Sequence, residues 1–327
     1  MGCNTASLAF KKCMEPVTVA RTPLILDVKG NSLDDGPGIR SVVFFKGCPL
    51  SCLWCHNPEG KKTGPEIAFD RGRCLDCGNC REVCPEKALS RQNPFVLDRN
   101  RCTLCYACLQ ACPSGALERV GQEMSIEEIL EKIVPDKPFF EASGGGVTLS
   151  GGEPTLFMDF AGKLLEAIKG QNIHTLLETC GQFDMDRFMA LLYPHLDAVY
   201  FDIKLMDPRT HKAYCGVSNH KILDNFSQLF KTAKKDGKRV LPRTPLVPGI
   251  TDTEKNLSDI AAFLKGLNVT QAALLAYNPL WHDKTEKIGA IDPYQTDKAM
   301  GTFSESIVLE KSREIFSRAG ILTQASS

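Results

Sequence analysis

The chain has 327 residues, with 39 Lys and Arg against 39 Asp and Glu, and 43% of its residues are hydrophobic. This length fits one large α/β domain and a smaller module, and this composition can bury a full core. The zero net charge disfavours a nucleic-acid partner, and no apolar run reaches the roughly 18 residues of a membrane-spanning helix. Residues 1–20 lack the pattern of a secretory signal, so we expect a tail there and a cytoplasmic protein.

The predicted elements alternate along most of the chain. Branched and aromatic residues predict strands at 22–28 and 40–46, on either side of a turn-rich loop. Further strands are predicted at 146–150, 174–179, 196–204, 238–246 and 270–277. Helices are predicted at 125–134, 155–169, 184–193, 253–267 and 301–319, and the segment between the strand end at 204 and residue 236 is also expected to be helical. Six β/α units predict a parallel sheet that forms an open, partial barrel with its site at the carboxyl ends of the strands.

Two of the three cysteine runs have the same spacing. The runs CLDCGNCREVCP (74–85) and CTLCYACLQACP (102–113) both read C-x2-C-x2-C-x3-C-P, the spacing of bacterial ferredoxins with two [4Fe-4S] clusters. In such runs the fourth cysteine binds the other cluster. The predicted ligands are Cys74, Cys77, Cys80 and Cys112 for one cluster, and Cys102, Cys105, Cys108 and Cys84 for the other. Residues 66–119 are therefore expected to form an inserted ferredoxin-like domain, with structural zinc as the alternative.

The first cysteine run, CPLSCLWC, contains only Cys48, Cys52 and Cys55, although a cubane cluster takes four ligands. Its C-x3-C-x2-C spacing resembles the signature of the radical S-adenosylmethionine (SAM) superfamily. The resemblance implies a third [4Fe-4S] cluster, whose fourth iron is open to the amino and carboxylate groups of SAM. The stretch SGGEP (150–154) follows a predicted strand and resembles the motif that binds the methionine end of SAM in that superfamily.

Further stretches resemble one family within this superfamily, the activating enzymes of glycyl radical enzymes. These stretches are DDGPGIR (34–40), ASGGGVTLSGGEP (142–154), VYFDIKLMD (199–207), GVSNH (216–220) and LVPGITD (246–252), so the resemblance runs from about residue 22 to residue 290. The eight-cysteine insertion is typical of the longer members. The implied fold is α/β: a partial (β/α)6 radical SAM barrel formed by 21–65 and 120–327, with an inserted α+β dicluster ferredoxin-like domain.

The resemblance also implies which residues bind SAM. They are Trp54, Cys55, His56, Gly151, Gly152, Glu153, Glu178, Thr179, Asp202, Ile203, Lys204 and Asn278. Glu153 is expected to pair with the methionine ammonium. Asp202 and Lys204 are expected to act beside the three cluster cysteines, near SAM and the target glycine.

Several positions carry weaker expectations. Glu178 and Thr179 stand where the short activases have an Asp-Thr pair that helps to form a monovalent-cation site. Asn278 stands where those activases have a histidine, which excludes a histidine base at that position. Asp35 and Arg40 are expected to help dock the partner's glycyl loop, with a loop acid and a surface arginine as the alternative. The remaining cysteines are expected to be free thiols: Cys3, Cys13, Cys180 and Cys215.

The implied activity is that of an oxidoreductase. Reduced flavodoxin or ferredoxin supplies one electron, SAM is cleaved to methionine and a 5′-deoxyadenosyl radical, and this radical takes a hydrogen atom from a glycine of a partner glycyl radical enzyme. We expect a monomer, with a slight lean toward a benzylsuccinate or alkylsuccinate synthase as partner. The other partners considered are glycerol or diol dehydratase, choline lyase and hydroxyphenylacetate decarboxylase.

Two other classes of protein remain alternatives from the sequence alone. One is a radical SAM enzyme that acts on a small molecule or on RNA. The other is a dicluster ferredoxin that only carries electrons, although this class leaves the first cysteine run, GGEP and the β/α units without a role.

Overall fold

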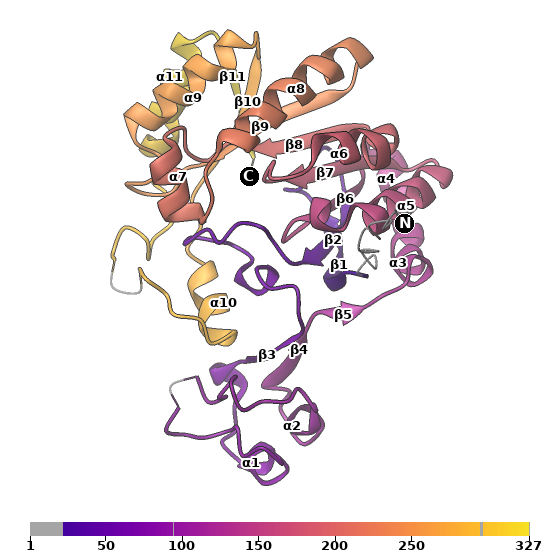
Figure 1. Ribbon diagram of the computed structural model, residues 1–327, viewed down its shortest axis with the longest axis vertical. Coiled ribbons are helices and arrows are strands. Elements are labelled where there is room, and N and C mark those ends of the chain that lie inside the picture. Colours follow the sequence, from indigo (N-terminus) through magenta and orange to yellow (C-terminus); the bar gives the residue numbers. More distant parts are fainter. Residues whose placement is uncertain (1–21, 94, 295–296, 327) are drawn as a thin grey trace, which may run out of the picture.

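The main sheet has nine strands within residues 22–93, 95–294 and 297–326, the parts of the chain that the computed structural model describes. The strand order is β11-β10-β9-β8-β7-β6-β2-β1-β5 (Figure 1). Its strands are β1 (Leu24–Ser32), β2 (Arg40–Lys46), β5 (Gln122–Glu123), β6 (Gly146–Gly151), β7 (His174–Thr179), β8 (Ala198–Asp202), β9 (Arg239–Pro245), β10 (Gln271–Leu275) and β11 (Leu322–Ser326). The predicted tail, residues 1–20, lies outside the described residues.

The parallel pairing predicted from the alternating elements is confirmed. β2 pairs with β6 in parallel, and each strand from β6 to β10 pairs in parallel with the next, as six β/α units require. The structure adds β11, which was not predicted and which extends the parallel part beside β10. β1 pairs with β2 in antiparallel fashion, because the short loop between them cannot form the long crossover that parallel strands need.

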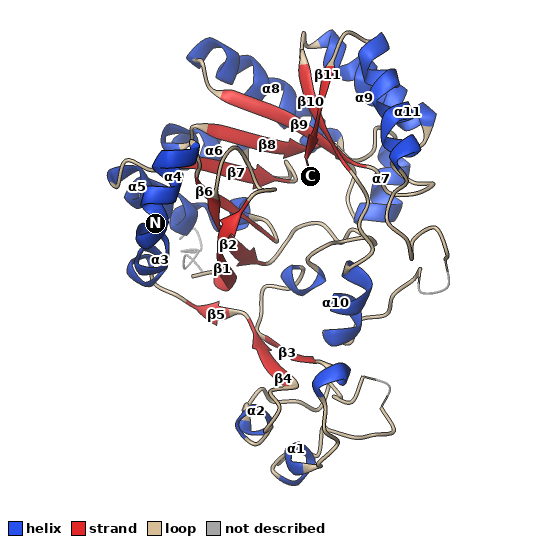
Figure 2. Cartoon of the chain, turned by 180° about the vertical axis from the view of Figure 1, so that it is seen from behind, coloured by secondary structure: helices blue, strands red, loops and turns tan. Residues whose placement is uncertain are grey.

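Helices cover the outer face of the sheet (Figure 2). They are α3 (Ile126–Ile133), α4 (Lys137–Ser143), α5 (Met158–Gly170), α6 (Met185–Leu191), α8 (His220–Asp236), α9 (Glu254–Gly266) and α11 (Ser306–Arg318). Helix α7 (Pro208–Cys215) lies beyond the carboxyl ends of the strands. A capping box begins α3, with the Ser125 hydroxyl accepting from the Glu128 N–H and the Glu128 carboxylate accepting from the Ser125 N–H. None of the helices in the described ranges has the length and apolar character needed to cross a bilayer.

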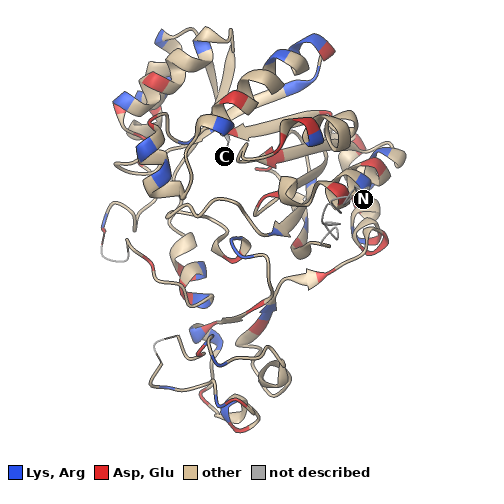
Figure 3. Cartoon of the chain, in the orientation of Figure 1, with Lys and Arg blue, Asp and Glu red and all other residues tan. Residues whose placement is uncertain are grey.

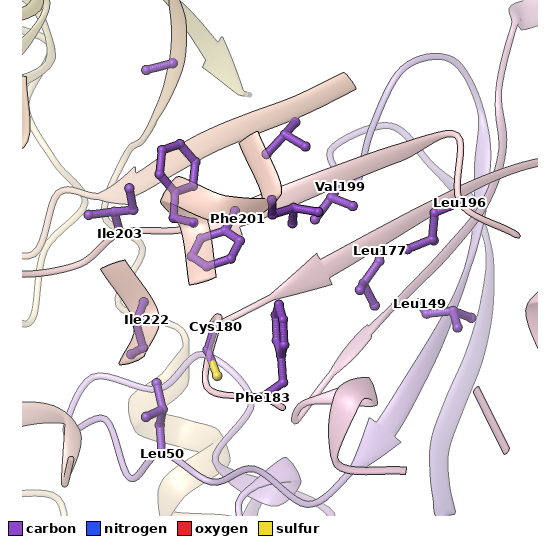
Figure 4. Packing of buried hydrophobic residues seen from close by; sticks show 14 of the residues in the cluster. Leu50, Leu149, Leu177, Cys180, Phe183, Leu196, Val199, Phe201, Ile203 and Ile222 are labelled. Atoms are coloured by element: carbon purple, nitrogen blue, oxygen red, sulfur yellow. The ribbon is translucent and has the colours of Figure 1, made fainter. Parts of the chain in front are cut away.

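The two faces of the sheet bury different residues, because successive strand side chains point to opposite faces. Outward residues such as Leu149, Leu177 and Val199 pack in the large core that includes helix residues (Figure 4). Inward residues form a small separate cluster: Leu176, Ala198, Tyr200, Leu241 and Ala273. Inward positions nearer the carboxyl ends of the same strands are polar, so the barrel interior changes from apolar to charged along its length.

The cysteine-rich insertion has its own small sheet and core. β3 (Glu66–Phe69) pairs with β4 (Leu117–Val120), and two one-turn helices, α1 (Asn79–Glu82) and α2 (Ala107–Gln110), lie between these strands in the chain. Its buried core consists of Ile67, Ala88, Leu89, Leu97, Cys108 and Leu117. Both signs of charge are interspersed over the insertion and the barrel (Figure 3).

Helix α10 (Trp281–Lys287) was not predicted, and it joins the insertion to the barrel (Figure 1). Lys287 pairs with Asp70 at 2.8 Å, at the start of the insertion. Lys284 pairs with Glu59 at 3.3 Å and donates to the His56 carbonyl oxygen at 3.1 Å, in the segment that follows the first cysteine run. The helix therefore contacts both cysteine-bearing regions.

Candidate functional site

A cavity of about 520 Å³ lies at the carboxyl ends of the parallel strands. Its lining residues come from the loop after β1, the first cysteine run, and the ends of β6 to β10. The lining includes these predicted site residues: Cys48, Cys52, Trp54, Cys55, His56, Gly151, Gly152, Glu178, Thr179, Asp202, Lys204 and Asn278. Residues far apart in the sequence thus meet where the open barrel was expected to bind its ligand.

The three cysteines of the first run all line this cavity. A hydrogen bond with Cys215 lowers the pKa of the Cys52 thiol to about 7, against the opposing effect of burial. Burial raises the pKa of Cys55 to about 12. The Cys48 sulfur accepts the Leu50 N–H at 3.4 Å, a contact that suits a thiolate.

The end of α7 holds the cysteine loop in place. The Cys215 carbonyl oxygen accepts the Ser51 N–H at 2.9 Å, and the Tyr214 carbonyl oxygen accepts the Leu53 N–H at 3.0 Å. Gly216 has a positive φ of 87°, and a Cβ there would lie 2.3 Å from the Ser51 hydroxyl oxygen. The glycine is therefore needed both for the helix end and for this close approach.

The GGE turn packs directly on the start of the cysteine loop. The Gly152 N–H donates to the Phe45 carbonyl oxygen at 2.8 Å, and the Glu153 N–H donates to the Gly47 carbonyl oxygen at 2.7 Å. A Cβ on Gly152 would lie 2.2 Å from the same Gly47 oxygen. Only glycine permits this contact, which places Gly151 and Gly152 on the cavity wall.

The Glu153 side chain is not among the residues that line the cavity. Its carboxylate is buried and accepts from the Thr155 N–H and hydroxyl at 3.2 and 2.7 Å, the Thr179 hydroxyl at 2.9 Å and the Cys180 N–H at 2.6 Å. This placement does not support the expected pairing with the ammonium of SAM. The carboxylate instead ties the GGE turn to the end of β7.

Ile203 also lies outside the cavity lining. Its side chain is buried in the large hydrophobic core, where Figure 4 shows it with Phe201 and Cys180. Its backbone bonds to the neighbouring strand, with its N–H donating to the Arg243 carbonyl oxygen at 2.8 Å. A direct contact of the Ile203 side chain with SAM is therefore not supported.

A chain of alternating charges crosses one wall of the cavity. Arg243, which was not predicted, donates to Glu178 and, at 2.9 Å, to Asp202. Lys204 pairs with the second Asp202 oxygen at 2.8 Å, and the Ser150 hydroxyl donates to Glu178 at 2.7 Å. The available sequence signal for this residue was an arginine within the predicted strand at 238–246.

Burial and pairing shift the ionisation of these groups in opposite directions. Burial raises the pKa of Glu178, although Arg243 opposes this effect. Burial would also raise the pKa of Asp202, but Arg243 and Lys204 together hold it below its ordinary value. The pKa of Lys204 is raised because Asp202 outweighs the effect of burial. Asp202, Lys204 and Arg243 therefore favour their charged forms, whereas burial shifts Glu178 toward its protonated form.

The adenosine side of the predicted site contains aromatic and amide groups. His56 packs edge-on to Tyr277, with ring centroids 6.3 Å apart. Burial, with Lys284 and Lys204 nearby, lowers the pKa of His56 to about 4, so its imidazole is neutral at pH 7. The Asn278 side-chain oxygen accepts the Leu280 N–H at 2.8 Å, which orients the amide at the cavity wall.

Of the two residues expected to dock the glycyl loop, only Asp35 lines the cavity. Arg40 is 0% exposed and donates to the Thr148 hydroxyl at 2.6 Å and to the Val147 carbonyl oxygen at 2.7 Å. Burial lowers its pKa to about 10. Arg40 cannot reach a partner protein, and it is not a surface arginine either. It is an internal anchor at the beginning of β2.

The insertion brings together the crossed cysteine sets. One small cavity is lined by Cys84, Cys102, Cys105 and Cys108, the predicted ligands of one cluster. In the other set, burial raises the pKa of Cys80, and the neighbouring thiols of Cys112, Cys74 and Cys77 act in the same direction. Each fourth cysteine thus lies beside the first three cysteines of the other run, as the ferredoxin spacing requires.

The two runs of the insertion also share a backbone conformation. Left-handed residues recur at matched positions, which are Asp76 and Leu104, Gly78 and Tyr106, and Lys87 and Gly115. In both runs the first cysteine sulfur accepts the N–H two residues on, at 3.4 Å. The insertion is therefore a structural repeat as well as a sequence repeat.

The residues present fit both groups that the resemblance implies. Soft thiol donors in sets of three, four and four suit iron–sulfur clusters, and backbone N–H groups face the first sulfur of each run. The large cavity combines an aromatic side with a charged side, as a nucleoside joined to an amino acid requires. Four further cysteines were expected to be free thiols. Cys180 and Cys215 are free and buried, whereas Cys3 and Cys13 lie outside the described residues.

The comparisons with known proteins agree with this geometry. A model described as the radical SAM superfamily matches residues 99–261, and a 4Fe-4S dicluster domain model matches residues 73–116. A radical SAM methyltransferase from Sphaerobacter thermophilus shares the fold, with a TM-score of 0.50 at 12% identity over 93% of this chain and 76% of that chain. The chain is thus a radical SAM enzyme with a dicluster domain.

Several relatives define the family more closely. An isethionate sulfite-lyase activating enzyme from Nitratidesulfovibrio vulgaris is 41% identical over 80% of this chain and 86% of that protein. A trans-4-hydroxy-L-proline dehydratase activating enzyme from Clostridioides difficile is 41% identical over 81% and 88%. A benzylsuccinate synthase activating enzyme from Thauera aromatica is 34% identical over 88% of each chain. The protein belongs to the glycyl radical enzyme activating enzymes, as its motifs predicted.

Proposed function

We propose that this chain binds three [4Fe-4S] clusters and activates a glycyl radical enzyme. Cys48, Cys52 and Cys55 are proposed to hold one of these clusters beside SAM. One observation supports this most strongly: these three thiols, the Gly151–Gly152 turn and the Asp202–Lys204 pair line a single cavity. The cluster and SAM, when bound, supply reductive cleavage of the sulfonium and hydrogen abstraction from a glycine.

The chain's own residues bind and orient the ligand. The Gly151–Gly152 turn brings its backbone to the cavity wall, where it suits the methionine end of SAM. Neutral His56 and Asn278 suit the adenosine end, because both can hydrogen-bond without adding charge. The Lys204–Asp202 pair places fixed charges on the cavity wall, where they would orient a charged ligand.

The insertion is proposed to bind two clusters through the eight crossed cysteines and to receive electrons from flavodoxin or ferredoxin. Thiolate-ligated cubanes have the low potentials that such a role needs. A separate sheet and core support the proposed domain limits, with 66–119 as the insertion, 21–65 and 120–327 as the barrel, and 1–20 as a tail. We also propose a monomer and a cytoplasmic location.

The partner is proposed to be a glycyl radical enzyme that presents its glycine on a loop at the cavity mouth, near Asp35. Sequence identity does not favour the initial lean toward benzylsuccinate synthase, because that relative is 34% identical and the isethionate and hydroxyproline relatives are 41% identical. Isethionate sulfite-lyase and trans-4-hydroxyproline dehydratase are therefore tested alongside it.

The test is anaerobic incubation of the reduced protein with SAM and each purified partner, followed by EPR spectroscopy. A glycyl doublet that appears with one partner supports the proposal and names that partner. Loss of the doublet in Cys52→Ala is expected, since that change removes a ligand of the SAM-binding cluster. A doublet of equal size in that variant would contradict the proposed mechanism.

A further inference from the structure

The monovalent-cation site implied at Glu178 and Thr179 does not fit this structure, because side-chain and backbone donors already occupy its oxygen atoms. Arg243 binds one Glu178 oxygen, and the Ser150 hydroxyl donates to the other at 2.7 Å. The Thr179 hydroxyl donates to Glu153 at 2.9 Å and accepts the Gly181 N–H at 3.0 Å. A metal cation needs oxygen lone pairs, and these are directed at hydrogen atoms instead.

The neighbouring carboxylate is occupied in the same way. One Asp202 oxygen accepts from Arg243 at 2.9 Å, and the other accepts from Lys204 at 2.8 Å. We infer that the guanidinium of Arg243 takes the place of a monovalent cation between Glu178 and Asp202 in this chain. This inference concerns the SAM site of the proposed function, but the structural observation stands without it.

The backbone builds this arrangement into the barrel. Asp202 and Arg243 are register partners on the adjacent parallel strands β8 and β9, so both side chains point inward at the same level. Glu178 faces Tyr200 in the β7–β8 register, and the Arg243 guanidinium lies over the Tyr200 ring, 5.4 Å from its centroid. Three neighbouring strands and a ring therefore fix the position of the guanidinium.

The geometry and charge of arginine suit this position. A planar guanidinium carries several donors in a fixed fork, so it can bind two carboxylates at once, whereas lysine offers a single point of charge. The methylene that distinguishes Glu178 from an aspartate lengthens the side chain toward Arg243. Arg243 already binds both carboxylates and Lys204 binds Asp202, so an added cation would have to displace one of these side chains.

The consequence is a SAM site that does not depend on sodium or potassium. The test uses the full-length, anaerobically prepared protein with its clusters, in NaCl, KCl or tetramethylammonium chloride at equal ionic strength. Two quantities are measured: the 23Na NMR line width during a titration with protein, and the rate of SAM cleavage. The 23Na line width can be measured without a partner enzyme and without turnover. It therefore tests this inference even if the proposed function is wrong.

Wild-type protein is expected to give no saturable 23Na broadening, and its SAM cleavage is expected to change by less than about twofold between the three salts. Arg243→Met removes the guanidinium and leaves two carboxylates together. That variant is expected to show saturable 23Na broadening that KCl reverses, and cleavage that rises at least about fivefold with Na⁺ or K⁺.

Two further variants make the result decisive. Glu178→Asp keeps Arg243 and every charge, so it should fold and, like the wild-type protein, should show no saturable 23Na broadening. Arg239→Met removes an exposed arginine at the other end of β9, and it should behave as wild type. Saturable, KCl-reversible broadening in the wild-type protein would overturn the inference. So would the absence of any 23Na signal in an Arg243→Met variant that keeps the wild-type circular dichroism spectrum.

Discussion

The insertion and the barrel hold their cysteines in different ways. In the insertion, thiols form much of the interior: Cys108 is part of the buried core, and Cys80, Cys84 and Cys102 pack against it. In the barrel, Cys52 belongs to an extensive hydrocarbon core formed by the sheet and its helices, and Cys48 and Cys55 pack against that core. The barrel can therefore fold around its hydrophobic residues, whereas the insertion depends on what its thiols bind.

The difference also separates two ways of building a site. Each half of the insertion is made by a single short run whose spacing and left-handed residues repeat. The barrel site draws on residues from Asp34 to Phe303, brought together by strand register. A change at one cysteine should therefore affect the whole insertion. Changes around the barrel cavity should instead have separate effects on SAM cleavage and on the free energy of unfolding.

The largest expected effect is on the SAM cluster. Cys52→Ala should lower SAM cleavage at least about a thousandfold and remove about four irons per chain, because one ligand of an incompletely ligated cubane is lost. Products are measured as methionine and 5′-deoxyadenosine, with dithionite as reductant. The matched variant Cys74→Ala should lose a similar amount of iron but retain most of this cleavage. If both variants failed equally, the proposed division of roles would be wrong.

Removal of iron should affect the two regions unequally. Chelation of the reduced protein should raise proteolytic cleavage within 66–119 by about a hundredfold, because cluster binding supplies most of the folding free energy of so small a module. Cleavage sites are identified by mass spectrometry, and helix content by circular dichroism. The barrel helices should keep their signal. Uniform cleavage over both regions would show that the barrel needs its cluster as well.

Within the barrel, Arg40 should affect stability rather than partner docking. Arg40→Met should lower the free energy of unfolding by about 2 kcal/mol, since it leaves buried oxygen acceptors near Thr148 and Val147 without their donor. Denaturant unfolding measures this loss, and the exposed Lys231→Met is the control. The affinity for the glycyl radical enzyme should stay unchanged at temperatures below the melting range. A loss of affinity without a loss of stability would show that Arg40 does help to dock the partner.

The smallest expected effect is at helix α10, between the two regions. Lys284→Met removes partly exposed contacts to Glu59 and the His56 carbonyl oxygen, so the expected cost is about 0.5 kcal/mol. Hydrogen exchange should increase in α10 and in the segment after Cys55, where the lost contacts lie. Lys255→Met, which breaks an exposed pair on α9, should leave these regions as in wild type. Unchanged exchange in Lys284→Met would mean that the pair does not couple the regions.

Much of the fold could be predicted because its signals are local. The barrel strands β1, β2 and β6 to β10 were found within a few residues, because the alternation of apolar strands with helices is strong. β11, α10 and the short strands β3, β4 and β5 were not found. β11 is a short, mixed sequence that forms a strand only beside β10. α10 is stabilised by ion pairs with distant segments, which no local pattern reveals.

The sequence by itself determined the cluster-binding spacing, the parallel order of the barrel and the family, because these depend on distances along the chain. The tertiary structure alone decided which side chains face the cavity. It placed Glu153 and Ile203 away from the cavity, buried Arg40 inside the barrel, and brought Arg243 between Glu178 and Asp202. The physical reason is strand register: partners on β7, β8 and β9 lie tens of residues apart, and only pairing of the strands brings their side chains to one level.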